Sequence, residues 1–89
     1  MPTVQLLIKG RVQGVFYRAS AKDIAKDLGV TGWIRNTPDD HVEAMISGTQ
    51  QQLDTFITWC RRGPRRAVVA DVIVTPKEDL DFDGFKIEQ

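Results

Sequence analysis

The sequence predicts an α+β fold of the ferredoxin-like, split βαβ kind, an antiparallel sheet with two helices on one face and a short extra C-terminal strand. Several short segments alternate apolar with polar residues, as half-buried strands do. Two longer segments repeat apolar residues at the three- and four-residue spacing of a helix. These segments follow one another twice as strand, helix, strand, and no linker rich in glycine or serine divides them. We therefore expect residues 1–89 to form a single domain.

The first strand-helix-strand unit occupies the first 36 positions. Residues 4–8 alternate as a strand does, and residues 30–36 predict the second strand. Gly29 is expected to end the helix between them. The apolar face of that helix follows the i, i+3, i+4, i+7 spacing and consists of Ala21, Ile24, Ala25 and Leu28.

The second unit starts with a turn at residues 37–40 and a strand at residues 41–47, where Val42, Ala44 and Ile46 share one face. Thr49 and Gln52 predict a capping box at the start of the second helix. That helix is expected to end at Gly63-Pro64, and its buried stripe is Leu53, Phe56, Ile57 and Cys60. The next strand alternates Val68, Ala70, Val72 and Val74 before Thr75-Pro76, and a short strand follows at Phe85–Ile87.

The segment from Gly10 to Arg18 reads GRVQGVFYR and connects the first strand to the first helix. Unpaired backbone N–H groups and the positive end of the helix dipole favour an anion at such a junction. The Arg18 guanidinium is suited to bidentate contact with phosphate oxygens. A strand-to-helix turn with a solvent-facing arginine explains the loop composition equally well. The segment is therefore a candidate phosphate site.

The loop lacks the residues that define two well-known classes of phosphate-binding loop. It is not a Walker A sequence, because no Gly-Lys-Ser/Thr follows. It is not a cysteine-phosphatase loop either, because Val12 stands where the nucleophile would be. Ser20 is the nearest hydroxyl and has no histidine beside it to act as a base. If the site is catalytic, we expect water to be the attacking group.

Two stretches of the chain resemble known signatures. The run from Ile8 to Arg18 closely resembles the first signature of the acylphosphatase family, whose members hydrolyse carboxyl-phosphate mixed anhydrides. Residues 32–36, GWIRN, continuing to Gly48, resemble the second signature. Residues 63–68 resemble the helix-to-strand junction of the family, and residues 85–87 resemble its closing strand. The resemblance covers nearly the whole chain and implies the same ferredoxin-like fold.

The resemblance also implies an activity and the residues that carry it. It implies a metal-independent hydrolase of small acyl phosphates that uses no cofactor and binds inorganic phosphate as a competitive ligand. The implied catalytic residues are Arg18, which binds the phosphoryl oxygens, and Asn36, which orients the attacking water. Without the resemblance, Asn36 fits better as a turn asparagine bonded to its own backbone. The implied phosphate cradle consists of the backbone N–H groups of Gln13, Gly14, Val15, Phe16 and Tyr17.

Two positions depart from the family pattern. Asp40 stands in the turn after Asn36 where members usually carry glycine, and aspartate tolerates left-handed backbone better than most residues. Tyr17 stands where phenylalanine is common, so its hydroxyl needs water or another partner. Neither departure changes the implied catalytic pair.

Composition limits the remaining possibilities. Twelve basic residues balance twelve acidic ones, and the single cysteine excludes an intrachain disulfide or a cysteine-based zinc cluster. No apolar run approaches the roughly 20 residues of a membrane span, and the N-terminus lacks the pattern of a signal peptide. We therefore expect a cytoplasmic monomer that binds neither membrane nor nucleic acid.

An alternative function follows from the basic cluster at residues 61–66, RRGPRR. A non-enzymatic ferredoxin-like module that binds RNA or another polyanion would use such an edge. Arginines in the last turn of a helix also complement its dipole, and we favour that explanation. His41, the only histidine, is expected at the surface rather than in a metal site, and Cys60 is expected in the core.

Overall fold

The structure is a computed structural model that describes residues 1–88. Gln89, the last residue of the predicted domain, lies outside this range. The predicted order of helices and strands is confirmed. The elements are β1 (Thr3–Arg11), α1 (Tyr17–Leu28), β2 (Thr31–Asn36), β3 (Val42–Ser47), α2 (Gln50–Arg62), β4 (Val68–Lys77) and β5 (Phe85–Ile87).

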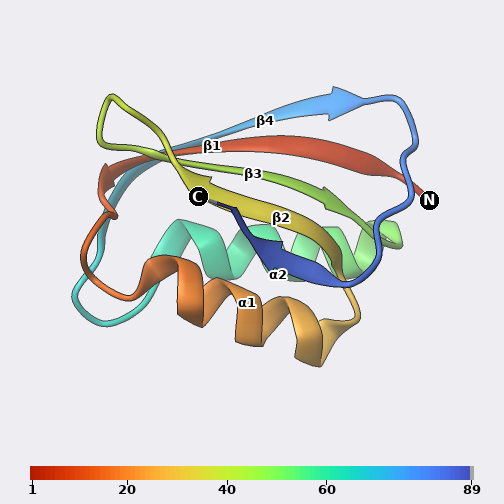
Figure 1. Ribbon diagram of the computed structural model, residues 1–89, viewed down its shortest axis with the longest axis horizontal. Helices are drawn as coiled ribbons and strands as arrows, with labels where there is room; N and C mark the ends of the chain where they lie inside the picture. The colour runs from red at the N-terminus through yellow and green to blue at the C-terminus, as the bar shows by residue number, and fades with distance from the viewer. Residues whose placement is uncertain (89) are drawn as a thin grey trace.

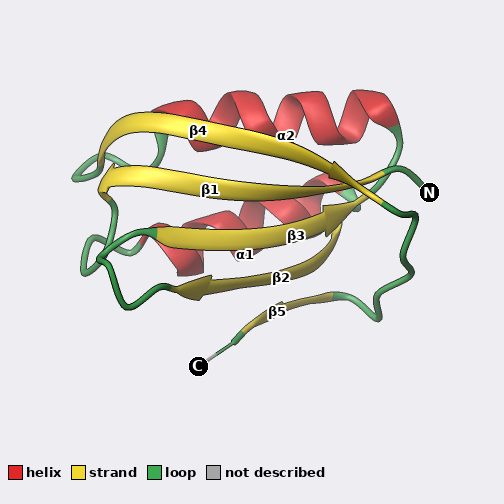
Figure 2. Cartoon of the chain, turned by 90° about the horizontal axis from the view of Figure 1, so that it is seen from above, coloured by secondary structure: helices red, strands yellow, loops and turns green. Residues whose placement is uncertain are grey.

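The strands form one sheet in the order β4-β1-β3-β2-β5. The first four are paired antiparallel, whereas β5 lies parallel to β2. Figures 1 and 2 show both helices on the same face of this sheet. The ferredoxin-like α+β fold predicted from the sequence is therefore confirmed, with the extra C-terminal strand at the β2 edge.

The register of the central strands decides where the site lies. Ile8 of β1 and Asn36 of β2 are both register partners of Val42, the first residue of β3. Because β1 and β2 each run antiparallel to β3, they run in the same direction and end at the same end of the sheet. The loop after β1 is thus brought beside Asn36, as the sequence predicted.

The two helices pack their expected faces on the sheet. Ala21 and Ala25 of α1 are fully buried, and Gly29 ends the helix in left-handed backbone. The capping box of Thr49 and Gln52 is present at the start of α2. Leu53, Phe56 and Cys60 of α2 are fully buried. Each large apolar side chain buried in this way stabilises the fold by about 1.5–3 kcal/mol.

The alternation expected along β4 is wrong. A register shift between Lys9 and Gly10 leaves one extra residue in β4, because Lys9 pairs with Asp71 while Gly10 pairs with Val69. Because of this β-bulge, the side chains that precede Ala70 in β4 alternate out of phase with those that follow it. Val72 is buried and Val69 packs on the core, but Val68 is 62% exposed. Ala70, the extra residue, is exposed as well. Val74, which pairs with Leu6 and shares a face with Val72, is exposed because β4 is at the edge of the sheet.

The bulge depends on a close approach of two backbones. Gly10 has a φ of 128°, and a Cβ atom there would lie 2.2 Å from the carbonyl oxygen of Val68. Only glycine fits at this position. The strand also continues through Pro76 to Lys77, farther than expected, because β4 is an edge strand and such strands tolerate proline.

The turn between β2 and β3 contains a left-handed aspartate. Asp40 has a φ of 69°. The Thr37 N–H donates to the carbonyl of His41 at 2.9 Å, and the His41 N–H donates to the Thr37 hydroxyl at 3.1 Å. The Thr37 hydroxyl also donates to the Asp39 carboxylate. The backbone of Asp40 therefore carries steric cost inside a turn that its neighbours hold closed.

Replacing Asp40 with glycine should relieve that cost. We expect Asp40→Gly to raise the free energy of unfolding by up to about 1 kcal/mol, measured by urea denaturation. The matched control is Asp39→Gly, which removes a hydrogen-bond acceptor and should not stabilise the protein. A clear loss of stability in Asp40→Gly would contradict this explanation and assign a needed contact to the Asp40 side chain.

Candidate active site

A cavity of about 380 Å³ lies at the end of the sheet where β1 and β2 terminate. Arg18, from the first turn of α1, and Asn36, from the end of β2, both line it. The sequence predicted this meeting of two distant segments. The lining residues in the described part of the chain are Val12, Gly14, Phe16, Tyr17, Arg18, Ala19, Asn36 and Ile87. Sequence reasoning did not identify Val12, Ala19 or Ile87 as part of this site.

The loop before α1 presents unpaired backbone donors. Gly14 has a φ of 71° and Phe16 a φ of 63°, so left-handed residues alternate with Val15 between them. Such alternation turns successive N–H groups toward one concavity and makes an anion-binding nest. Within residues 1–88, the N–H groups of residues 14–17 donate to no acceptor in the protein. Their donors are thus available to a ligand.

The N-terminus of α1 reinforces this concavity. Phe16 is the N-cap residue and provides no side-chain capping hydrogen bond, and the first turn holds no acidic residue. Serine, threonine or aspartate at the N-cap would instead satisfy one of the free N–H groups. The positive end of the helix dipole is therefore left uncompensated beside the loop, which favours an anion there.

Arg18 is half-buried at this helix end. The ion pairs within residues 1–88 join Met1 with Asp79 and Arg35 with Glu43, so Arg18 is in neither. A guanidinium without a carboxylate partner retains its donors for a planar anion such as phosphate. Arg18 and the backbone donors therefore give the cavity one consistent preference, for negative charge.

Asn36 brings an acceptor into this set of donors. Its side-chain Oδ1 is buried and has no hydrogen-bond partner among the described residues. A buried polar atom without a partner carries a desolvation cost, which an N–H or O–H donor inside the cavity would remove. The amide also supplies N–H donors, so the side chain is able both to accept a hydrogen bond and to donate one.

The side chain of Gln13 joins the two loops of the site. Its amide Nε2 donates to the Thr37 carbonyl at 3.0 Å and to the His41 carbonyl at 2.7 Å. The loop after β1 is thereby fixed to the turn that follows Asn36. The sequence assigned Gln13 a backbone role only. Because its partners are backbone carbonyls, which every residue has, no sequence pattern reveals this contact.

Tyr17 connects the loop to the second helix. Its hydroxyl donates to the carbonyl of Cys60 at 2.8 Å, and its ring lies 5.3 Å from that of Trp59. The carbonyl belongs to the last turn of α2, where the helix itself supplies no donor. The departure from phenylalanine at this position is therefore accommodated, because the extra hydroxyl has a buried partner.

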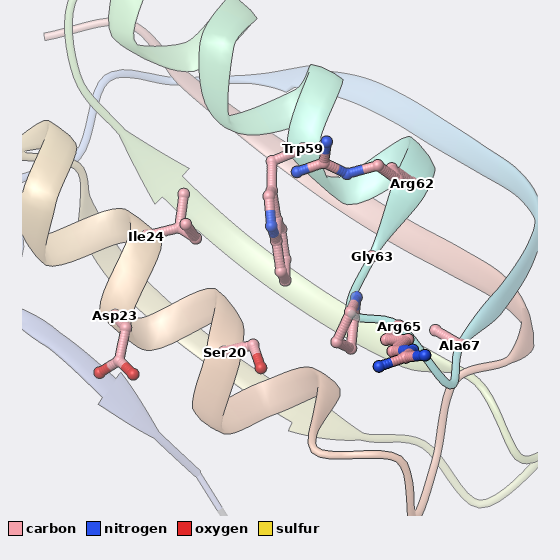
Figure 3. Close-up of a pocket in the computed structure, with 9 residues that line it drawn as sticks. Ser20, Asp23, Ile24, Trp59, Arg62, Gly63, Arg65 and Ala67 are labelled. Atoms are coloured by element: carbon pink, nitrogen blue, oxygen red, sulfur yellow. The ribbon is translucent and has the colours of Figure 1, made fainter.

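A larger cavity of about 610 Å³ lies between the two helices (Figure 3). Trp59, Arg62 and Arg65 line it, but neither Arg18 nor Asn36 does. Arg61 lines a different, smaller cavity against β4. The basic cluster is thus divided between two sides of the chain. This division disfavours the single polyanion-binding edge of the alternative function.

Two further properties concern the part of the chain that the structure describes. No three histidine, cysteine, aspartate or glutamate side chains in residues 1–88 gather closely enough to hold a metal ion. Over the same residues, neither helix has the length and apolar character that crossing a bilayer requires.

Comparison with known proteins identifies the family. Residues 4–87 match the model of the acylphosphatase family. The chain belongs to the acylphosphatase family. It is 45% identical to an acylphosphatase of Haloquadratum walsbyi, over 94% of this chain and 90% of that protein. It is also 45% identical to an acylphosphatase of Albidiferax ferrireducens, over 98% and 94% of the two chains.

A solved acylphosphatase structure supports the same assignment. The acylphosphatase from Bacillus subtilis superposes with a TM-score of 0.96 and 29% identity, over 100% of both chains. The family resemblance predicted from the two signatures is confirmed. The ferredoxin-like sheet with its two helices is therefore the acylphosphatase fold in this chain.

The contact made by Gln13 gives a testable prediction. Gln13→Ala removes two hydrogen bonds and should lower the free energy of unfolding by about 1–2 kcal/mol. The loop would also shift relative to Asn36, so kcat for an acyl phosphate should fall about tenfold or more in the folded protein. Urea denaturation and steady-state kinetics measure the two effects.

Gln5→Ala is the matched control, because the Gln5 amide donates to Glu43 within the sheet, away from the cavity lining. That variant is expected to lose stability without a comparable loss of kcat. An equal loss of kcat in both variants would mean that Gln13 contributes general stability only.

Proposed function

We propose that the chain hydrolyses small acyl phosphates to a carboxylate and inorganic phosphate, by attack of water at phosphorus. The observation that carries this proposal is the composition of the cavity at the end of β1 and β2. One space is lined by N–H groups, an arginine and a buried amide oxygen, for which residues 1–88 provide no acceptor, carboxylate or donor, respectively. Such a set of groups suits a tetrahedral anion together with a water molecule.

In this proposal, the backbone N–H groups of Gln13 to Tyr17 and the Arg18 guanidinium hold the phosphoryl oxygens. The negative charge on these oxygens is redistributed as the leaving carboxylate departs, and fixed donors stabilise it without reorganisation. The planar fork of Arg18 contacts two oxygens at once, which a lysine ammonium cannot reproduce.

Asn36 is proposed to orient the attacking water. Its buried Oδ1 accepts a hydrogen bond from the water, so that the water oxygen faces phosphorus. The P–O bond to the acyl group breaks as the new bond forms, and the released carboxylate is stable without a proton. The water proton passes to a phosphate oxygen of the substrate, so no general acid is needed.

The polar groups of the cavity also favour a reaction without a metal ion. Among residues 1–88, the lining contains N–H groups, a guanidinium and an amide, and no carboxylate, histidine or thiolate. Hard cations such as Mg²⁺ prefer carboxylate oxygens. Arg18 supplies the positive charge that a metal would otherwise bring. We further propose that the chain is a single domain and acts as a monomer, since its own sheet and helices enclose the core. We also propose that it acts in the cytoplasm.

The direct test is hydrolysis of acetyl and benzoyl phosphate in the presence of excess chelator. We expect full turnover, and we expect phosphate monoesters to be much weaker substrates because their alkoxide leaving groups are poor. Loss of activity on metal removal would contradict the metal-free mechanism. Absence of turnover with every acyl phosphate would instead favour a module that only binds anions.

A second test separates the roles of the two side chains. Arg18→Ala should lose both turnover and binding of inorganic phosphate, and Arg18→Lys should also be severely impaired. Asn36→Ala should lose turnover while phosphate still binds, because water needs positioning only in the reacting complex. Kinetics and an NMR titration with phosphate distinguish the two variants.

Arg62→Ala is the control, since this arginine lies in the larger cavity between the helices and outside the proposed site. It should keep turnover within a few-fold of the unmodified protein. If Asn36→Ala abolished phosphate binding as fully as Arg18→Ala, the water-orienting role of Asn36 would have to be withdrawn.

A further inference from the structure

Phe16 is an unusual residue for its position in the site. Its side chain is 74% exposed, more than any other large apolar side chain among the described residues. Its φ of 63° lies in the left-handed region, which a bulky residue rarely adopts. It also occupies the N-cap of α1 without making a capping hydrogen bond. Exposure, backbone strain and a missing cap all disfavour phenylalanine here.

The phosphate cradle explains the backbone of Phe16 but not its ring. The left-handed conformation turns neighbouring N–H groups into the concavity, so this geometry belongs to anion binding. Glycine would adopt the same φ without strain, and asparagine would tolerate it better than phenylalanine does. Residues that break several local preferences at once are expected where function requires them. The aromatic side chain therefore requires a reason of its own.

The residues that line the cavity together with Phe16 suggest that reason. Phe16 lines the same cavity as Arg18 and Asn36, and two further lining residues, Val12 and Ile87, are apolar. The polar groups of the cavity are assigned to the phosphoryl group and to water. The acyl group of the substrate is the remaining part of the ligand, and it is the part that an apolar ring would contact.

We propose that Phe16 is a specificity-determining residue that packs against the acyl group, and that the preferred substrates carry an aromatic acyl group. The inference rests on the proposed function, because it concerns the same cavity. An aryl ring that stacks on Phe16 covers apolar surface now open to water, whereas an acetyl group covers little of it. Discrimination would therefore appear in the acyl group, not in the phosphate.

The test compares kcat/KM for benzoyl and acetyl phosphate in the unmodified protein and in Phe16→Asn. Asparagine tolerates the left-handed backbone better than phenylalanine does, so the urea midpoint should stay the same or rise. The ratio of benzoyl to acetyl phosphate should nevertheless fall about threefold to tenfold, mostly through the KM for benzoyl phosphate. A purely structural role for Phe16 would change stability and leave this ratio unmoved.

Two further variants complete the experiment. Phe16→Gly gives the same comparison if the asparagine variant folds poorly, since glycine relieves the strain without adding a polar group. Leu80→Asn is the matched control, because Leu80 is 44% exposed and its backbone contacts Thr3 and Ser47, at the opposite end of the sheet. The control should keep the unmodified ratio.

The results of these assays distinguish failure of the Phe16 proposal from failure of the proposed function. If the unmodified protein hydrolyses neither compound, the proposed function fails. If it hydrolyses both and neither Phe16 variant changes their ratio, the function stands and the role of Phe16 is overturned. A fall in the ratio in both Phe16 variants, with Leu80→Asn unchanged, supports the proposal.

Discussion

The pairing of β3 with both β1 and β2 is the constraint on which the site depends. Val42 is the common register partner of Ile8 and Asn36, and it is fully buried. A slip of one residue would turn Val42 toward the opposite face of the sheet, so burial of this side chain fixes the register. The same register aligns the end of β2 with the loop that follows β1. Core packing and site geometry are thus determined by one set of strand contacts.

The fold was predictable because its local signals agree with one another. The capping box at Thr49 and Gln52, the helix-ending Gly29 and the alternation of β3 all point to the elements that form. The departure in β4 has a physical cause. The segment Val68-Val69-Ala70 offers an apolar or small residue at every position, so its sequence does not reveal where a bulge shifts the phase.

The site was predictable in its family motifs and less so in its supporting contacts. Arg18 and Asn36 lie in signatures that the sequence displays, and the structure places both in one cavity. Gln13 acts through carbonyl groups, and Ile87 arrives from a strand that lies far away in the sequence. Contacts of this kind depend on tertiary arrangement, so only the folded chain reveals them.

In the loop between β1 and α1, the features that favour anion binding lower the stability of the protein. N–H groups that donate to no acceptor within residues 1–88 and a helix without a side-chain cap each reduce the stability of the free protein. The hydrogen bonds of Gln13 and Tyr17 hold the loop in place despite these losses. The unfavourable backbone of this loop is thus held by the hydrogen bonds of Gln13 before it and Tyr17 after it.

The burial of Tyr17 and Cys60 has a consequence for behaviour in alkali. Burial raises the pKa of the Cys60 thiol to about 12 and raises the pKa of the Tyr17 hydroxyl above its ordinary value. In the unfolded chain these groups ionise near about pH 8.5 and 10. Their contribution to stability is therefore complete below about pH 8.5 and is lost as the pH rises toward 12. Alkaline pH should therefore unfold the protein by ionising two side chains that the core holds neutral.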